Sequence, residues 1–168
     1  RVHWTNPVGP GFLEFVSRNH KKSVVIDDRI VYLGGINVCD HNFAWHDFML
    51  RIEDERAGAF MRDDIRATLR GENLSSRRDF GRFEIALLDG ERNPQLMEPV
   101  LRLVRGARRS IVVQSAYLTF PVFDELADAA GRGVAVTLVT PKHNNMRGMP
   151  SYQEWAAARA GVTVRFYD

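Results

Sequence analysis

Cysteine, long apolar runs and net charge are all scarce in this sequence, and each scarcity excludes a class of protein. The one cysteine, Cys39, cannot form a disulfide within the chain, which fits a reducing compartment. No apolar run approaches the roughly 20 residues of a transmembrane helix, and no signal-peptide pattern is present. The formal net charge is +2 over 168 residues, too small to indicate nucleic-acid binding by itself.

What is present indicates a soluble globular protein. The hydrophobic fraction is 45% and the charged fraction 26%, which excludes a disordered chain. Arginine greatly outnumbers lysine, which suits recognition of phosphate or carboxylate but is equally typical of a GC-rich genome. Because the sequence starts at Arg1 instead of a methionine, we expect it to be part of a longer protein.

The first half of the sequence predicts strands followed by one helix. The strand segments are short and rich in β-branched or aromatic residues: 12–16, 23–27, 30–34 and 48–52. Phe60, Ile65 and Leu69 recur at roughly helical spacing, and Gly71 stands where a helix would stop. The polar, glycine-bounded segment 71–81 is predicted to be a linker.

The second half alternates between strands and helices. Strands are predicted at 83–88, 110–118, 134–140 and 162–167. Asn93 and Pro94 are typical of a helix start, and Ser151 and Glu154 form a capping-box pattern. Such alternation predicts an α/β fold with a largely parallel sheet and helices on its faces.

Residues 18–37, "RNHKKSVVIDDRIVYLGGIN", carry the clearest chemical signal. His20 and Lys22 are two residues apart, so on a strand they share one face and can form an anion site that also moves a proton or attacks. Gly34 and Gly35 let the backbone approach a ligand closely, and Asn37 can donate to the same anion. The plainer interpretation is a surface strand with ordinary charges and a glycine turn.

Asp27 follows Lys22 by five residues and would face the other way in a regular strand. We therefore expect Asp27 to brace the structure and not to touch a substrate. A metal site is not predicted, because Asp40, His41, His46 and Asp47 lack a recognised ligand spacing.

The whole pattern resembles the HKD motif of the phospholipase D superfamily. It reads His-x-Lys, four residues, Asp, six residues, Gly-Gly-x-Asn. The following segment, "GGINVCDHNFAWHDFMLRIE", is similar to the corresponding part of bacterial cardiolipin synthases, and residues 115–141 and 151–168 resemble the start of that family's second half. The resemblance implies an α/β fold with a mixed sheet flanked by helices on both faces.

The resemblance also implies a role for each matching residue. The family forms a covalent phosphohistidine without a metal or cofactor, so His20 would be the nucleophile or else the acid for the leaving group. Lys22 and Asn37 would hold the phosphate oxygens, and Asp47 would orient the ring of His20. Asp27, Gly34 and Gly35 would be structural. Tyr117 and Phe120 would flank the mouth of the active site, although core aromatic residues fit their pattern equally well.

The sequence departs from the family in carrying one motif where a complete enzyme has two. The resemblance implies that residues 1–75 are the back end of a first half and 80–168 the front end of a second, with the second motif expected after Asp168. The two pieces would pack as one permuted domain or as two incomplete ones. Alone, the chain is expected to bind phosphate-like anions without turnover, because one histidine cannot be both nucleophile and acid.

The most favoured function is phosphatidyl transfer of the cardiolipin synthase type. The implied partners are phosphatidylglycerol-like head groups, a membrane surface at its cytoplasmic face, and a second His-x-Lys motif from the rest of the protein or another chain. The alternatives are a metal-independent phosphodiesterase acting on nucleic acid and a truncated module that binds phosphate without turnover. A nuclease would need a continuous basic groove, which the near-neutral balance of charge disfavours.

Overall fold

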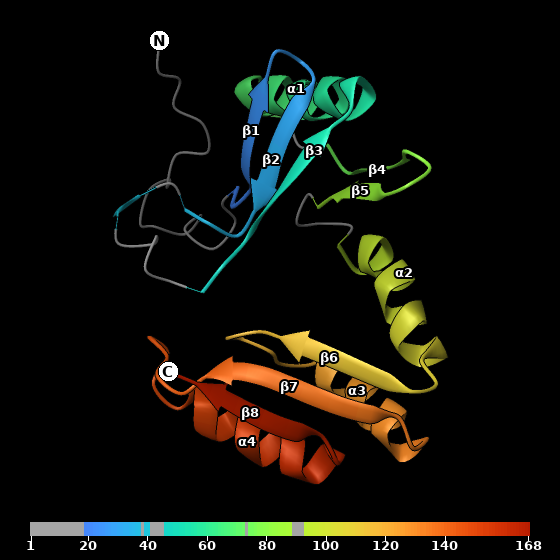
Figure 1. Ribbon diagram of the computed structural model, residues 1–168, viewed down its shortest axis with the longest axis vertical. Helices are drawn as coiled ribbons and strands as arrows, with labels where there is room; N and C mark the ends of the chain where they lie inside the picture. The colour runs from blue at the N-terminus through green and yellow to red at the C-terminus, as the bar shows by residue number, and fades with distance from the viewer. Residues whose placement is uncertain (1–18, 38, 41–45, 73, 89–92) are drawn as a thin grey trace. The chain divides into compact units, whose positions relative to one another are not determined.

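The computed structural model describes residues 19–37, 39–40, 46–72, 74–88 and 93–168, and within them the α/β class is confirmed (Figure 1). The chain divides into two compact units, Arg1–Leu96 and Met97–Asp168. The predicted strand at 12–16 lies outside the described residues. In the described part of the chain, no helix has the length and apolar character that crossing a membrane requires.

The first unit contains a small antiparallel sheet. Its strands are β1 (Lys22–Ile26), β2 (Ile30–Gly34) and β3 (Met49–Glu53), in that order across the sheet. A tight turn joins β1 to β2, with φ of 51° at Asp27 and 52° at Asp28. Positive φ at both central residues matches the right-handed twist of a hairpin, and aspartate tolerates it better than most residues.

Helix α1 (Glu55–Leu69) lies against one face of this sheet. The Asp54 side chain caps the helix by accepting from the backbone N–H groups of Arg56 and Ala57. The buried stripe differs from the predicted one, since Leu69 is 50% exposed. The side chains that α1 buries recur at three- and four-residue spacing: Ala57, Phe60, Met61, Asp64 and Ala67.

The predicted linker at 71–81 is wrong, because it contains a strand. Strand β4 (Ser76–Asp79) pairs antiparallel with β5 (Glu84–Leu87). The hairpin adds Phe80, Ile85 and Leu87 to the core beneath α1. The β4 side chains themselves are mostly exposed, which is why the segment is polar and gives no apolar strand pattern.

The second unit has the parallel sheet that the alternation predicted. Its strands are β6 (Ser110–Gln114), β7 (Ala135–Pro141) and β8 (Thr163–Tyr167), in sequence order. Helices α3 (Val122–Gly131) and α4 (Met149–Ala160) connect them and lie on one face (Figure 1). Right-handed crossovers that proceed in one direction put their helices on the same face.

The strands therefore form three small sheets in the described residues, not one mixed sheet with helices on both faces. In the first unit, β1 pairs antiparallel with β2 through a tight turn, and β2 also pairs antiparallel with β3. In the second unit, Val112 lies on the face away from α3 and α4 and is 72% exposed.

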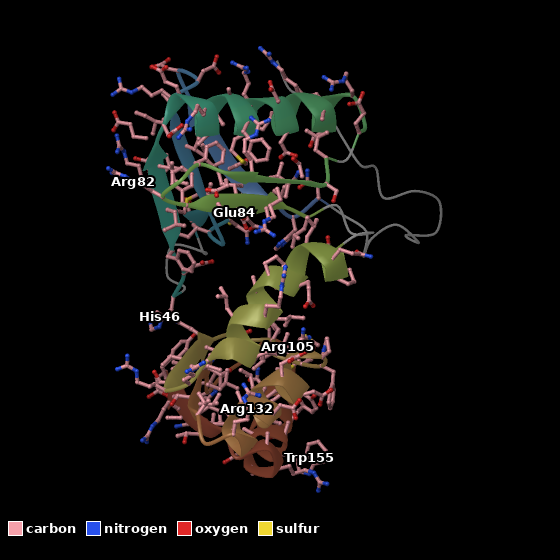
Figure 2. All side chains as sticks on the ribbon, turned by 90° about the vertical axis from the view of Figure 1, so that its right-hand side faces the viewer. His46, Arg82, Glu84, Arg105, Arg132 and Trp155 are labelled. Carbon is pink, nitrogen blue, oxygen red and sulfur yellow. The ribbon has the colours of Figure 1, made fainter. Side chains whose placement is uncertain are left out.

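Helix α2 (Asn93–Gly106) begins at Asn93, one residue before the predicted first helical position at Pro94. Charged contacts link its C-terminal end to α3. Arg105 Nε donates to Glu125 at 2.8 Å, and Arg132 donates to the carbonyl of Arg105 at 2.9 Å; Figure 2 labels both arginines. The capping box predicted at Ser151 is wrong, since α4 starts at Met149 after Gly148, whose φ is 87°. Ser151 lies inside the helix.

Candidate functional site

The His-x-Lys pair lies where β1 begins. Lys22 is the first residue of the strand and pairs with Gly34 of β2, while His20 precedes the strand and is exposed. The Lys22 ammonium donates to the carbonyl oxygen of His20 at 2.6 Å. The contact places the lysine charge beside the backbone of the histidine that is predicted to react.

Gly34 and Gly35 allow the chain before β3 to pass very close to β2. A Cβ on Gly34 would lie 2.2 Å from the backbone oxygen of Phe48, and a Cβ on Gly35 would lie 2.3 Å from Oδ1 of Asp47. The Gly35 N–H donates to the same Phe48 oxygen at 3.2 Å. The close approach that the glycines suggested is therefore made by the protein's own Asp47–Phe48 segment.

Asp47 lies two residues before β3, at the end of the sheet where Lys22 pairs with Gly34 and Gly34 pairs with Met49. Partial burial lowers the pKa of the Lys22 ammonium, and the nearby Asp47 carboxylate opposes that shift. A lysine and a carboxylate thus share one end of the β1–β3 sheet.

The Asp47 carboxylate accepts from the Phe48 N–H at 2.7 Å. Among the described residues, no hydrogen bond joins Asp47 to the ring of His20, and this contact stays a prediction.

Asn37 lies in the loop that follows the glycine pair. Its side chain is half-buried, and its backbone oxygen accepts from the N–H of Cys39 at 2.8 Å. This local turn holds Asn37 three residues after the end of β2. The contact of Asn37 with a phosphate oxygen stays a prediction.

Asp27 is not part of the strand that was predicted to contain it. Strand β1 ends at Ile26, and Asp27 is the exposed first residue of the turn, so strand alternation does not fix its direction. The ion pair that ties this turn to α1 is made by its neighbour, since Arg62 donates to Asp28 at 2.6 Å. The bracing role expected of Asp27 therefore has no contact to support it in the described residues.

Tyr117 and Phe120 belong to the second unit and follow β6. Tyr117 is 48% exposed and donates to Oδ1 of Asn145, while Phe120 is 60% exposed. Neither is a core aromatic residue, so that alternative is excluded. Their role at a substrate entrance stays a prediction.

Sequence reasoning missed one partly buried ion pair next to the motif. Lys21 Nζ donates to both carboxylate oxygens of Asp64 on α1, at 2.6 and 2.8 Å. The Asp64 side chain is only 2% exposed. A signal existed, because Asp64 is the one charged residue in the buried stripe of α1.

The metal alternative concerned four residues, of which His41 lies outside the described residues. In the parts of the chain that are described, no three His, Cys, Asp or Glu side chains gather in a group that could hold a metal ion.

Bacterial cardiolipin synthases are similar to this chain over nearly its whole length. Cardiolipin synthase 2 of Staphylococcus epidermidis is 30% identical over 189 residues, which covers 93% of this chain and 37% of that protein. Cardiolipin synthase of Staphylococcus aureus is 29% identical, with the same shares of each chain. Cardiolipin synthase of Clostridium perfringens is 21% identical and covers 95% of this chain and 40% of that protein.

The chain thus spans well under half the length of these curated relatives. It matches no protein-family model. The similarity covers 93% of the chain and therefore extends into both units. The chain is homologous to part of the bacterial cardiolipin synthases, which supports the assignment to the phospholipase D superfamily made from the motif.

Proposed function

We propose that the full-length protein containing this chain is a phosphatidyltransferase that acts on phosphatidylglycerol-like lipids at the cytoplasmic face of a membrane. The names of its relatives support this function. The structural observation that carries it is the placement of Asp47 against Gly35 and close to Lys22, at the end of the sheet where His20 enters. Phosphodiester exchange requires a basic group that holds the phosphate, a carboxylate that orients the histidine, and the histidine itself.

The reaction is an exchange of one phosphoester bond for another through a phosphohistidine. In the first step a neutral histidine ring forms a bond to phosphorus, while the bond from phosphorus to the leaving glycerol oxygen breaks and a second histidine protonates that oxygen. In the second step the second histidine removes the proton of the acceptor alcohol, whose oxygen displaces the histidine. His20 takes one of these two roles.

The other site residues act on charge and orientation. Lys22 and Asn37 hold the non-bridging phosphate oxygens and stabilise the charge that develops on them. Asp47 accepts from one ring nitrogen of His20, which fixes the tautomer and leaves the other nitrogen free to react. These groups supply the stabilisation that a cation gives in other phosphoryl-transfer enzymes, so the reaction requires no metal.

The second histidine comes from a second His-x-Lys motif, because the 168 residues contain one such pattern. That motif belongs to another part of the full-length protein or to a second chain. His143 is not a candidate, since "PKHNN" has no lysine two places on.

The test is a substrate comparison with the full-length protein. Vesicles that contain phosphatidylglycerol should yield cardiolipin and glycerol, and single- or double-stranded DNA should remain intact. Cleavage of DNA without lipid exchange would identify a nuclease. Binding of inorganic phosphate without either reaction would identify a phosphate-binding module.

A further inference from the structure

Lys21 and Asp64 form a long-range ion pair that the proposed reaction does not use. The two residues are 43 positions apart, and the ammonium lies 2.6 Å from one carboxylate oxygen and 2.8 Å from the other. The carboxylate is 2% exposed and the lysine side chain 28% exposed. Burying the Asp64 carboxylate is unfavourable unless a partner charge compensates it, and the partly exposed Lys21 supplies that charge. Because an apolar pair of similar size often stabilises a fold as well, the pair is a candidate for a role beyond stability.

The pair lies where the candidate site needs support. The hydrogen-bonded ladder of β1 starts at Lys22, so His20 and Lys21 precede it. The Asn19 side chain accepts from the Lys21 N–H at 3.0 Å, but that contact is local. Among described residues 19–21, the contact to Asp64 is the one side-chain link to another element.

The side chain of Lys21 lies on the same side of the sheet as α1. Val25 packs into the core beneath α1, and Lys21, four residues earlier, reaches Asp64 on the same helix. Lys22, the first residue of β1, is three residues before Val25, so alternation puts Lys22 on the face of the sheet away from α1. A slip or rotation of this segment by one residue would exchange the two faces.

We propose that Asp64, acting through Lys21, is a positioning residue that holds the His-x-Lys segment with His20 and Lys22 on the reactive face. The inference rests on the proposed function. A directional contact to both carboxylate oxygens fixes where the segment lies along α1 and how it is rotated about its own axis. Apolar packing would restrict both less strongly. Small misplacements of a reacting group lower rates strongly, so loss of the contact should reduce turnover more than substrate binding.

Two variants of the full-length protein separate positioning from stability. Asp64→Asn leaves Lys21 without its counter-charge, and Lys21→Met/Asp64→Leu replaces the pair by apolar groups, which should return the melting temperature to near wild type. Both are expected to lower kcat of the folded fraction by about tenfold to a hundredfold, with KM changed by less than about threefold. Wild-type kcat in the apolar double variant would overturn the proposal even if Asp64→Asn fails to fold.

Rescue and control variants complete the test. Lys21→Arg keeps a donor that can engage both oxygens and should retain kcat within about threefold. Asp28→Asn removes the other ion pair between this hairpin and α1, also at 2.6 Å, at the far end of β1. Asp28→Asn should leave kcat unchanged. An equal decrease in kcat in Asp28→Asn would show that the Lys21–Asp64 pair acts only through the stability of the fold.

A second measurement distinguishes failure of the proposed function from failure of the positioning role of Asp64. Inorganic phosphate is titrated while the ring signals of His20 are followed by NMR, assigned with His20→Ala. If the wild type transfers no phosphatidyl group but phosphate still shifts these signals, the function fails, and a different phosphate-induced shift of the His20 ring signals in Asp64→Asn would support the positioning role. The same His20 shift as in the wild type, or normal kcat in Asp64→Asn of an active enzyme, overturns the positioning role alone.

Discussion

The Asp47 carboxylate lies so close to Gly35 that a Cβ at residue 35 would come within 2.3 Å of Oδ1 and 2.6 Å of Oδ2. The absence of a side chain at Gly35 therefore leaves the space that the Asp47 carboxylate occupies. The same carboxylate influences the charge of Lys22. One glycine thus helps set the position of a group that we assign to orienting His20.

Gly35→Ala should reduce activity while it leaves the fold intact. The backbone φ of Gly35 is not in the left-handed region, so alanine is allowed there, and the new methyl group meets the end of a side chain that can rotate away. Displacement of the carboxylate should lower kcat of the full-length enzyme by at least about tenfold, similar to Asp47→Asn. Steady-state kinetics and thermal unfolding would measure the two effects.

The neighbouring glycine provides the matched control. In Gly34→Ala the methyl group would meet the backbone oxygen of Phe48 at 2.2 Å, which cannot move without disturbing the pairing of β2 and β3. We expect Gly34→Ala to lower the free energy of unfolding by about 1–3 kcal/mol or more. Equal melting temperatures for the two variants, or normal kcat in Gly35→Ala, would contradict this division.

Asp47→Asn should lower the pKa of Lys22 further. Burial already lowers this pKa from its ordinary value, and the negative charge of Asp47 acts in the opposite direction. Removing that charge leaves the effect of burial unopposed, so the ammonium loses its proton at a lower pH. A titration of isotope-labelled lysine by NMR would detect the change, and the loss of activity at alkaline pH should begin earlier. A raised or unchanged pKa would show that the two groups do not interact.

Most helices and strands could be predicted from sequence because their patterns are local. Strand β7 extends one residue beyond the predicted 134–140 at its C-terminal end, and α1 stops next to Gly71 as expected. The linker at 71–81 could not be recognised as a strand, because the side chains of β4 face water. The strand β5 was predicted at 83–88, but its pairing with β4 is visible only in the fold.

The candidate site was predictable as a motif and less so as a geometry. Spacing suggested that His20 and Lys22 share a face, but the direction of Asp27 depended on where β1 ends, and β1 ends one residue earlier than predicted. The buried face of α1 was assigned from large apolar residues, whereas its true stripe contains Asp64. The partner of Asp64 lies 43 residues away, a separation that no local pattern reveals.

Gly58→Ala should destabilise the first unit although alanine favours helices. The gain in helix propensity is about 1 kcal/mol. A Cβ at Gly58 would, however, lie 2.0 Å from the backbone oxygen of Asp28, where α1 meets the β1–β2 turn. Because neither partner is a mobile side chain, we expect a net loss of about 1–3 kcal/mol in the free energy of unfolding.

The control for Gly58→Ala is Gly131→Ala in α3, where an added Cβ would meet nothing within 4 Å. That variant should be as stable as the wild type or slightly more so in the same chemical denaturation experiment. A Gly58→Ala protein as stable as Gly131→Ala would show that α1 does not pack against the turn as closely as described.

Turnover of the full-length enzyme should persist in excess chelator. The proposed stabilisation of charge comes from Lys22 and Asn37, not from a cation. Activity is measured with and without the chelator on vesicles of constant composition, because divalent ions also alter lipid surfaces. Complete loss of activity that one divalent ion restores would refute metal independence.

The most direct test of the central claim is kcat for phosphatidyl transfer by the full-length enzyme carrying His20→Ala. Loss of a nucleophile or of a general acid both predict a decrease of at least about a hundredfold. His143→Ala, which removes an exposed histidine of the second unit, is the matched control and should retain wild-type kcat. A His20→Ala enzyme that is folded and turns over within tenfold of the His143→Ala enzyme would contradict the assignment of His20 to the reaction.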